Sequence, residues 1–418
     1  MATKVWRGDA PAVKQINTVT PASVTIGNTF TLTINGKTIT FTATAATVAN
    51  VTAGLAAAVA ASTIPEFRRV TATDGTTVLR LTSTVAGVPF TQTSSSADGS
   101  GSAGHSLSTS TTTASSGPNH WGIAANWSPS GVPVDSDDVV IENSSVDILY
   151  DLSQTGISLT SLSIPASYTG KIGLPTYNPA GYYEYLTTYL TLESAATVTI
   201  GHGQGAGSAR LRLNLGTTAA AAVSVQGTGR AESTALPALL ICGSHADNTI
   251  SITQGNVGLA LESGTTAQFP VVRVGSGGSP ASDVTLICGA GCTLGGTITQ
   301  AGGNVTTQTN VATWTKTAGS TSTLRGTATI TAINQDGQGT HYWESSGTIT
   351  TGNFRGEGAV LDCSHDLRGR TLTNGTFTGG GYINDPNKTM TRTNPITTDV
   401  KSYPKHVLFS APSSLQVS

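Results

Sequence analysis

Apolar and small polar residues alternate along most of this chain, and turns centred on glycine interrupt the alternation at short intervals. Residues 284–288 and 328–332 show the pattern, with an apolar side chain at every second position. A two-residue period predicts β-strands that turn one face toward a core. Between residues 248 and 385 no run has the length of a helix, so we expect this part to consist of strands and turns.

A short sequence motif that ends in glycine recurs in the same region. Gly302, Gly319, Gly337 and Gly356 close successive copies at spacings of 17, 18 and 19 residues, and a looser copy ends at Gly379. Strand-rich repeats with a period of roughly 20 residues bury their apolar faces by stacking on one another. We therefore predict a mainly β fold, a right-handed parallel β-helix (β-solenoid) of about 12 coils.

The first 93 residues have a different pattern. Two strand-like runs flank the dipeptide Asn35-Gly36, which is a strong signal for a two-residue hairpin. Residues 48–61 carry apolar side chains at helical spacing and follow Thr47, a residue type that favours the N-cap. A second hairpin comes next. These elements predict a small α+β domain of ββαββ type over residues 1–93.

The rest of the chain divides into three parts. Residues 94–116 are mainly Ser, Thr, Gly and Ala, which bury too little apolar area to offset the entropy of ordering, so we predict an extended linker. We expect the β-helix over residues 117–390, with Trp121 and Trp127 as an apolar cap on its first coil. Residues 391–418 are expected to form a C-terminal tail.

Composition and charge restrict the partners. The 418 residues are 11% charged with a formal net charge of −2, and no basic stripe indicates nucleic-acid binding. No run of 18 apolar residues is present, so no membrane partner is expected. The N-terminal residues lack the apolar segment of a signal peptide, and we expect the protein to be made in a cytoplasm or to have lost its leader.

Several short stretches resemble known proteins. Residues 4–10 (Lys-Val-Trp-Arg-Gly-Asp-Ala), 30–36, 41–45 and 86–91 look like a module of the structural proteins of tailed bacteriophages. Residues 126–128 (Asn-Trp-Ser), Pro133 and residues 138–141 (Asp-Val-Val-Ile) are similar to the opening of many bacterial and phage β-helix proteins.

The resemblance implies a virion protein without enzymatic activity. It implies a capsid decoration protein on the head surface, a homotrimer whose small domain attaches to the major capsid protein or to another virion protein. The alternative is a tail spike or fibre that binds or cleaves a host surface polysaccharide, and a second alternative is a bacterial surface β-helix adhesin. A spike needs an acidic groove and an adhesin needs an export signal, and the sequence shows neither.

One cluster of titratable residues is the candidate site if the protein is an enzyme. Asp362, His365, Asp366 and Arg368 are close in sequence, and the polysaccharide lyases and hydrolases that use this fold employ grouped carboxylates as acids and bases. Strand alternation would place Asp362 and Asp366 on one side and His365 on the other. The alternative is a polar surface turn with Asp–Arg pairing.

Other motifs indicate neither a cofactor nor a metal. Residues 135–138 (Asp-Ser-Asp-Asp) offer oxygen ligands for calcium but lack the glycine and glutamate of an EF-hand, so a solvated turn is expected. Residues 201–207 are rich in glycine, yet the Lys-Ser/Thr of a phosphate loop does not follow. Cys288 and Cys292 are closely spaced without two further zinc ligands, and we expect the cysteines to be buried thiols.

Aromatic residues are the candidates for an interface. Tyr177, Tyr182, Tyr183, Tyr185 and Tyr189 form a group near prolines and a glycine, and Trp6 lies in the phage-like N-terminal stretch. Aromatic rings anchor protein interfaces and stack on sugar faces. We predict an interface or a protruding loop at the tyrosines, with core packing and glycan contact as alternatives.

Overall fold

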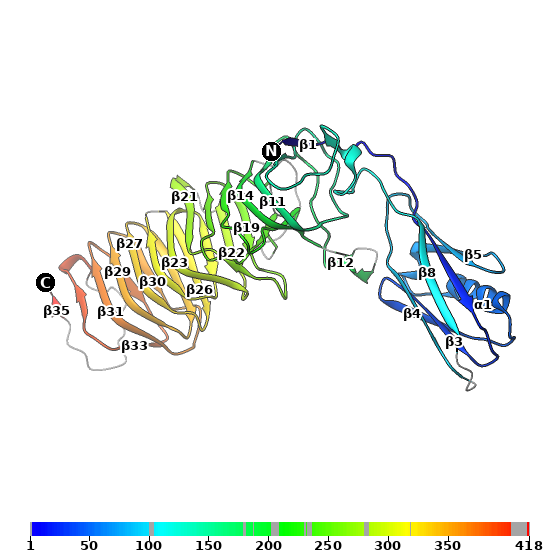
Figure 1. Ribbon diagram of the computed structural model, residues 1–418. Coiled ribbons are helices and arrows are strands. Elements are labelled where there is room, and N and C mark those ends of the chain that lie inside the picture. The colour runs from blue at the N-terminus through cyan, green and yellow to red at the C-terminus, as the bar shows by residue number, and fades with distance from the viewer. Residues whose placement is uncertain are drawn as a thin grey trace.

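The computed structural model describes residues 2–99, 104–178, 181–186, 188–201, 209–229, 231, 236–279, 284–317, 319–402 and 416–417. It is mainly β, with 51% strand and 6% helical residues, and it contains a large parallel sheet. Figure 1 shows a long stack of parallel strands and a smaller unit beside the end of the stack at which the chain begins. The mainly β, parallel architecture predicted from the alternating pattern is therefore confirmed.

Two ladders of parallel strands build the stack, and over most of its length each strand pairs with the next but one. The first ladder contains β10 (Asp138–Val140), β11 (Ser153–Ile164), β14 (Leu190–Ile200), β16 (Ala222–Val225), β18 (Thr249–Ile252), β21 (Val271–Ser279), β23 (Cys292–Gly302), β25 (Val311–Lys316), β27 (Ile330–Asp336), β29 (Thr348–Arg355), β31 (Arg370–Thr378) and β34 (Ile396–Thr398). The second ladder contains β15 (Leu211–Asn214), β17 (Leu239–Cys242), β19 (Gly255–Leu259), β22 (Val284–Cys288), β24 (Asn304–Thr307), β26 (Ser320–Gly326), β28 (Gly339–Ser345), β30 (Ala359–Asp362) and β32 (Tyr382–Asn384). We call one strand of each ladder, with the turn between them, a layer.

Short elements complete the stack. They are η2 (Ala124–Asn126), β12 (Tyr177–Asn178), β13 (Tyr182–Tyr183), β20 (Ala267–Gln268), β33 (Met390–Arg392), η3 (Val400–Ser402) and β35 (Gln416–Val417). The parallel sheet continues past residue 390, where the sequence predicted a tail, because β34 pairs with β31 and buries Ile396 against the core. Residues 403–415 and 418 of that predicted tail lie outside the described residues.

An apolar cap closes the first layer. β1 (Thr3–Trp6) pairs in parallel with β10 and antiparallel with β9 (Trp127–Ser128). The buried ring of Trp127 packs edge to face on Trp6, with ring centroids 5.1 Å apart, and on Trp121, at 4.7 Å. A terminal layer has no neighbour to cover its apolar face, so large rings take that role. Trp6 was predicted at an interface within residues 1–93, but the structure places it and β1 in the stack.

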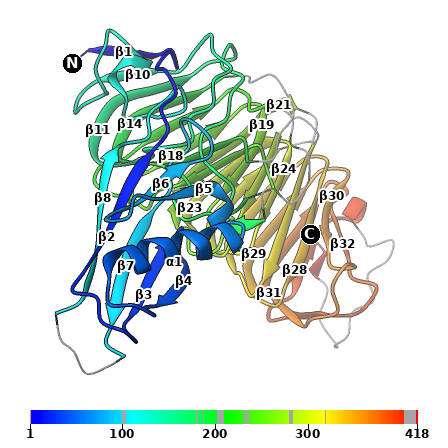
Figure 2. The same ribbon diagram turned by 90° about the vertical axis from the view of Figure 1, so that its right-hand side faces the viewer.

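The smaller unit is inserted between β1 and β9, and we call residues 16–113 the inserted unit. It contains β2 (Ile16–Ala22), β3 (Thr29–Ile34), β4 (Lys37–Thr42), α1 (Val48–Ala61), η1 (Phe67–Arg69), β5 (Val70–Asp74), β6 (Leu79–Ser83), β7 (Gln92–Ala97) and β8 (Ser106–Thr113). The strands form two antiparallel sheets, ordered β5-β6-β2-β8 and β4-β3-β7. Figure 2 shows α1 lying across these strands, where its apolar side buries Val51 and Leu55 in a core separate from that of the stack.

Local sequence explains the elements of the inserted unit. α1 begins after Thr47, whose side chain accepts a hydrogen bond from the backbone N of Asn50 at 3.3 Å, as expected of an N-cap. Asn35 and Gly36 have φ of 49° and 76°, which the two central positions of a tight hairpin require. The predicted helix and first hairpin are confirmed. None of the helices in the described part of the chain has both the length and the apolar composition needed to cross a membrane.

The Ser/Thr-rich segment at residues 94–116 contains two strands where the composition predicted a linker. β7 pairs with β3 along its whole length, and β8 pairs with β2. Leu107 is buried in the core, while most other side chains of these strands are exposed. Neighbouring strands therefore supply the stabilising hydrogen bonds, and Thr suits a pleated surface. Composition alone underestimated this order. Residues 100–103 lie outside the described residues.

Side-chain contacts reinforce the junction between the inserted unit and the stack. His120 is buried, with Nδ1 2.9 Å from Asp151 Oδ2 and Nε2 3.0 Å from the carbonyl oxygen of Gly87. The hydroxyl of Tyr185 donates to the carbonyl oxygen of Pro89 at 2.6 Å. Gly87 and Pro89 belong to one loop of the inserted unit, so both contacts hold the same loop against the stack.

Candidate functional site

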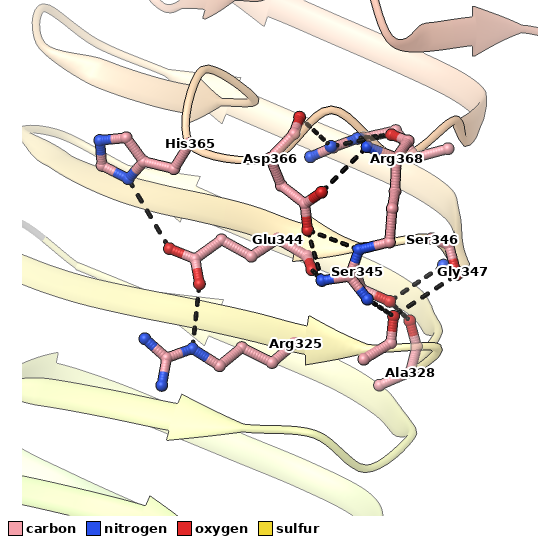
Figure 3. Close-up of polar contacts among 11 residues, drawn as sticks. Arg325, Ala328, Glu344, Ser345, Ser346, Gly347, His365, Asp366 and Arg368 are labelled. Carbon is pink, nitrogen blue, oxygen red and sulfur yellow. Dashed lines mark hydrogen bonds and ion pairs between the residues drawn. The ribbon is translucent and has the colours of Figure 1, made fainter.

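The grouped titratable residues lie on the outer face of the second ladder and in the loop between β30 and β31. Figure 3 shows His365, Asp366 and Arg368 of this loop beside Glu344 of β28 and Arg325 of β26. Parallel pairing of β26 with β28 places Arg325 directly next to Glu344. We call these five residues the outer cluster.

Asp366 and Arg368 form the tightest pair of the outer cluster. The Asp366 carboxylate accepts hydrogen bonds from the backbone N of Arg368 at 2.9 Å and from its Nε at 2.7 Å, and Nη2 also contacts Asp366 Oδ2. The guanidinium donates to the carbonyl oxygens of Gly326 at 3.1 Å and Glu344 at 2.7 Å. The hydrogen bond from the Arg368 side chain lowers the pKa of Asp366, so this carboxyl group stays ionised.

Glu344 connects two further members. Its Oε2 accepts from Arg325 Nε at 2.9 Å, and its Oε1 lies 3.7 Å from His365 Nδ1. The ring of His365 stacks on Tyr342 with centroids 4.7 Å apart and planes 18° from parallel. The side chains of Arg325 and His365 are 57% and 53% exposed, so water screens both pairs and each contributes little stability.

Asp362 belongs to a separate network. Its Oδ1 accepts from the backbone N of Ser364 at 2.8 Å and from its Oγ at 2.6 Å, and its Oδ2 accepts from Asn384 Nδ2 at 3.1 Å. β30 ends at Asp362, and residues 363–369 form a loop. Strand alternation therefore does not extend to Asp366, and the predicted common side for the two carboxylates is not found.

The outer cluster has the chemistry of an ion-pair network. A general acid needs a carboxyl group whose pKa is raised toward the working pH. Asp366 has the opposite shift, and each oxygen of Glu344 faces a basic side chain. Nowhere in the described part of the chain do three or more His, Cys, Asp or Glu side chains gather as a metal site requires. The geometry is suited to fastening the loop onto β26 and β28.

The chain matches no family model, no curated protein and no solved structure.

The predicted interface tyrosines lie in different environments. Tyr183 is 71% exposed and packs edge to face on Tyr177 across the β12–β13 hairpin, with centroids 5.2 Å apart. Tyr189 is buried, which corresponds to the core-packing alternative, and the hydroxyl of Tyr185 contacts the inserted unit. The backbone of Tyr182 is part of β13, but its side chain lies outside the described residues. The exposed pair on the hairpin is the part of this prediction that remains accessible.

The acidic residues of the run at 135–138 connect the first layers of the stack through hydrogen bonds. Its carboxylates accept hydrogen bonds from different partners: Asp135 from the backbone N of Ser158, Asp137 from that of Ala2, and Asp138 from Ser161 Oγ. Carboxylates engaged separately in this way do not converge on one cation. The predicted glycine-rich loop, apart from Gly201, lies outside the described residues.

All four cysteines are free and buried, as predicted. Burial raises the pKa of Cys242 to about 11 and that of Cys363 to about 12. Thiolates are the reactive form of cysteine, so Cys242 and Cys363 are protected from oxidation and alkylation in the folded protein.

Sequence reasoning missed Arg325 and Glu344. The two residues are 19 positions apart, which is one repeat period, and the parallel register places them side by side. Extending the period from the glycines to the charged positions would have paired them. The contacts of His365 and Arg368 come from a loop and follow no period.

Proposed function

We propose that the chain is a structural protein of a tailed-phage virion, a capsid decoration protein that projects a β-helix from the head surface. In this proposal each layer of the stack is one coil of a right-handed parallel β-helix. The inserted unit is the small α+β domain that attaches to the major capsid protein or to another virion protein. The protein is made in the host cytoplasm and acts as a homotrimer on the virion.

The position of the inserted unit is the observation that carries the proposal. The unit leaves and rejoins the stack at the tryptophan-capped end, between β1 and β9, so two chain crossings hold it there. The contacts of His120 and Tyr185 reinforce the junction. An attachment domain fixed at one end leaves the other layers free to project. Parallel ladders of this length leave few open strand edges, which protects a projecting rod from aggregation.

A tail spike or fibre that binds a host polysaccharide is the second candidate. The stacked rings of His365 and Tyr342 lie on the outer face beside Glu344, and Tyr382 on the same ladder is 42% exposed. Accessible aromatic rings next to polar groups are typical of sugar-binding surfaces. This patch is the observation that favours the second candidate.

Light scattering of the purified chain at low micromolar concentration tests the assembly. We expect a mass near three times 42.3 kDa, and a mass of 42.3 kDa would contradict a preassembled trimer. Sedimentation of the labelled chain with purified phage heads and, separately, with purified tails tests the attachment. The proposal predicts binding to heads. Binding to tails, or release of sugar from a host polysaccharide, would favour the spike instead, and binding to neither would contradict a virion role.

A further inference from the structure

The buried side chains of the stack change from aliphatic to polar within a few layers. The register aligns one interior residue of each first-ladder strand with that of the next strand, and we call this series column A. From β11 to β34 column A contains Ile164, Ile200, Val225, Ile252, Val274, Gln300, Lys316, Gln335, Phe354, Phe377 and Thr398. All of these side chains are buried. The column is thus aliphatic up to β21 and polar from β23 to β27.

The second ladder changes in the same layers. Its corresponding series, column B, contains Leu211, Leu239, Val257, Leu286, Val305, Ser322, His341, Leu361 and Ile383, all buried. The two polar members of column B lie on β26 and β28, the next two strands of the second ladder after β25, which carries Lys316. Polar residues therefore appear in both columns at the same depth of the stack, where they can satisfy one another.

Lys316, Ser322 and His341 form a hydrogen-bonded chain across the interior. Lys316 Nζ donates to Ser322 Oγ at 2.6 Å and to the carbonyl oxygen of Thr340 at 2.8 Å, and Ser322 Oγ lies 2.7 Å from His341 Nδ1. A hydroxyl that accepts from the amine has its own proton available for Nδ1, so the proton of the neutral ring is on Nε2. That nitrogen has no hydrogen-bond partner among the described residues.

Among the described residues, no negatively charged side chain surrounds the hydrogen-bonded group of Lys316, Ser322 and His341. The strands on either side of β25 present Gln300 and Gln335, and the ring of Trp314 packs edge to face on His341 with centroids 5.4 Å apart. Glu344, on the same strand as His341, is engaged on the outer face. A positive charge on the amine or the imidazole would therefore be buried without a counter-charge, which is costly.

A buried arginine near these layers is held away from this network. Arg370, at the start of β31, lies over the ring of Trp343, 5.8 Å from its centroid, and donates to the carbonyl oxygens of Asp366 and Arg368.

Burial lowers the pKa of Lys316 well below its ordinary value. Burial, followed by the charge of Lys316, lowers the pKa of His341. The two bases of the cluster therefore resist protonation while the layers are closed.

We propose that Lys316, Ser322 and His341 form an acid-responsive opening point, at which a fall in pH releases the layers from β25 to β28 while the aliphatic layers up to β21 stay closed. A proton added to His341 Nδ1 removes the acceptor of the Ser322 hydroxyl and places a positive charge close to Lys316. Opening admits water, which solvates both charges. The device goes beyond the proposed function, because it concerns how the stack responds to its surroundings.

The direction of the pH dependence follows from linkage. Both groups are bases whose pKa is lowered in the closed state, so the open state binds more protons and closed layers gain stability as the pH rises. In the open state lysine titrates near about 10.4 and histidine near about 6.5. The opening constant should rise about tenfold for each pH unit lost below the lysine value, and about a hundredfold per unit once histidine also takes up a proton.

Hydrogen exchange of the full chain, read by mass spectrometry of peptides, tests the proposal. After correction for intrinsic exchange rates, protection of peptides from β25 to β28 should fall at least tenfold per pH unit between pH 8 and pH 5. Peptides from β14 to β21 should change less than threefold. Equal pH dependence in both regions, or none in β25 to β28, would overturn the proposal.

A double variant, Lys316→Met with His341→Leu, places apolar residues at the two titratable positions. It should abolish the pH dependence in β25 to β28, and protection at pH 8 at least as high as that of the wild type would show that it folds. His365→Gln is the matched control, because it removes an exposed histidine over the same layers and should leave the pH dependence unchanged. Loss of the dependence in the control, or its persistence in the double variant, would assign the effect to other groups.

Discussion

The layers from β11 to β21 and the layers from β23 to β28 share one backbone architecture and have different interiors. In the first set, column A is aliphatic from Ile164 to Val274 and needs only apolar contact. In the second set, Lys316 lies at the equivalent place and needs a hydroxyl and a carbonyl as partners. Parallel ladders thus accept a polar interior where both columns supply complementary groups. The variants below test that difference, from the largest expected effect to the smallest.

Placing a lysine in an aliphatic layer, without hydrogen-bond partners, should have the largest effect on stability. Val225→Lys places an amine in an aliphatic layer, where the facing residues of column B are leucines. We expect a loss of about 4 kcal/mol or more in the free energy of unfolding, because an unpaired charge is buried. Urea unfolding followed by circular dichroism measures it. Ser224→Lys, one position along the same strand on its other face, should change stability by less than about 0.5 kcal/mol, and a similar loss in both variants would contradict the interpretation.

Replacing a buried side-chain amide that makes hydrogen bonds through both its nitrogen and its oxygen should have the second-largest effect on stability. Gln300 Nε2 donates to the carbonyl oxygens of Gly303 and Thr321, and its Oε1 accepts from Trp314 Nε1. Gln300→Leu removes all three hydrogen bonds, among them the one that the buried Trp314 Nε1 donates, and should lower the free energy of unfolding by about 3 kcal/mol. Gln335 is the matched control.

In Gln335, Nε2 donates to the carbonyl oxygen of Gly339, while Oε1 has no hydrogen-bond partner in the described part of the chain. Gln335→Leu should therefore cost about 1 kcal/mol or less. If the two leucine variants lose equal stability in urea unfolding, the hydrogen bonds of Gln300 do not account for its role.

The buried amine of Lys316 should lower the free energy of unfolding by an amount that depends on pH. Lys316→Met should raise the free energy of unfolding by about 1–2 kcal/mol at pH 7, because a buried charge site becomes apolar. Since the pKa of Lys316 is lowered in the fold, the stability difference should shift in favour of the variant by about 1.4 kcal/mol for each unit of falling pH. Above pH of about 10.4 the variant should be the less stable protein, because Ser322 Oγ and the carbonyl oxygen of Thr340 lose the amine as a hydrogen-bond donor. Unfolding at a series of pH values measures this. An advantage that is constant with pH would show that Lys316 keeps its ordinary protonation.

Exposed charges over the same layers should have the smallest effect. Arg325→Gln removes one partner of Glu344 on the outer face, where the arginine is more than half exposed. Stability should change by less than about 0.5 kcal/mol at physiological salt, because water and ions screen the pair. A loss above about 1 kcal/mol would mean that the outer cluster contributes more to holding the loop than its exposure indicates.

The sequence predicted the features that depend on local pattern. The glycine period and the alternation predicted parallel strands, and Asn35-Gly36 and Thr47 predicted the first hairpin and the start of α1. It did not predict that β1 belongs to the stack, because pairing between Thr3–Trp6 and Asp138–Val140 joins segments far apart in the chain. The strands β7 and β8 were missed for a related reason, since their partners, and not their composition, order them.

The candidate site was predicted in part. Asp366 and Arg368 pair as the surface-turn alternative expected, since two residues separated by one position can meet within a turn. Asp362 was grouped with them because the end of β30 could not be located from the pattern. The interior chain of Lys316, Ser322 and His341 was not recognised at all, although the spacing of 19 residues from Ser322 to His341 follows the repeat period.

The most direct test of the interior cluster is a pH titration by NMR of the full chain with ¹³C-labelled lysine, in which Lys316→Met identifies the Lys316 signal. The structure predicts that this signal titrates at a pH far below the signals of the other lysines, because burial without a counter-charge favours the neutral amine. If the Lys316 signal instead titrates together with the exposed lysines near pH of about 10.4, the amine is charged inside the fold and the account of the polar layers is wrong.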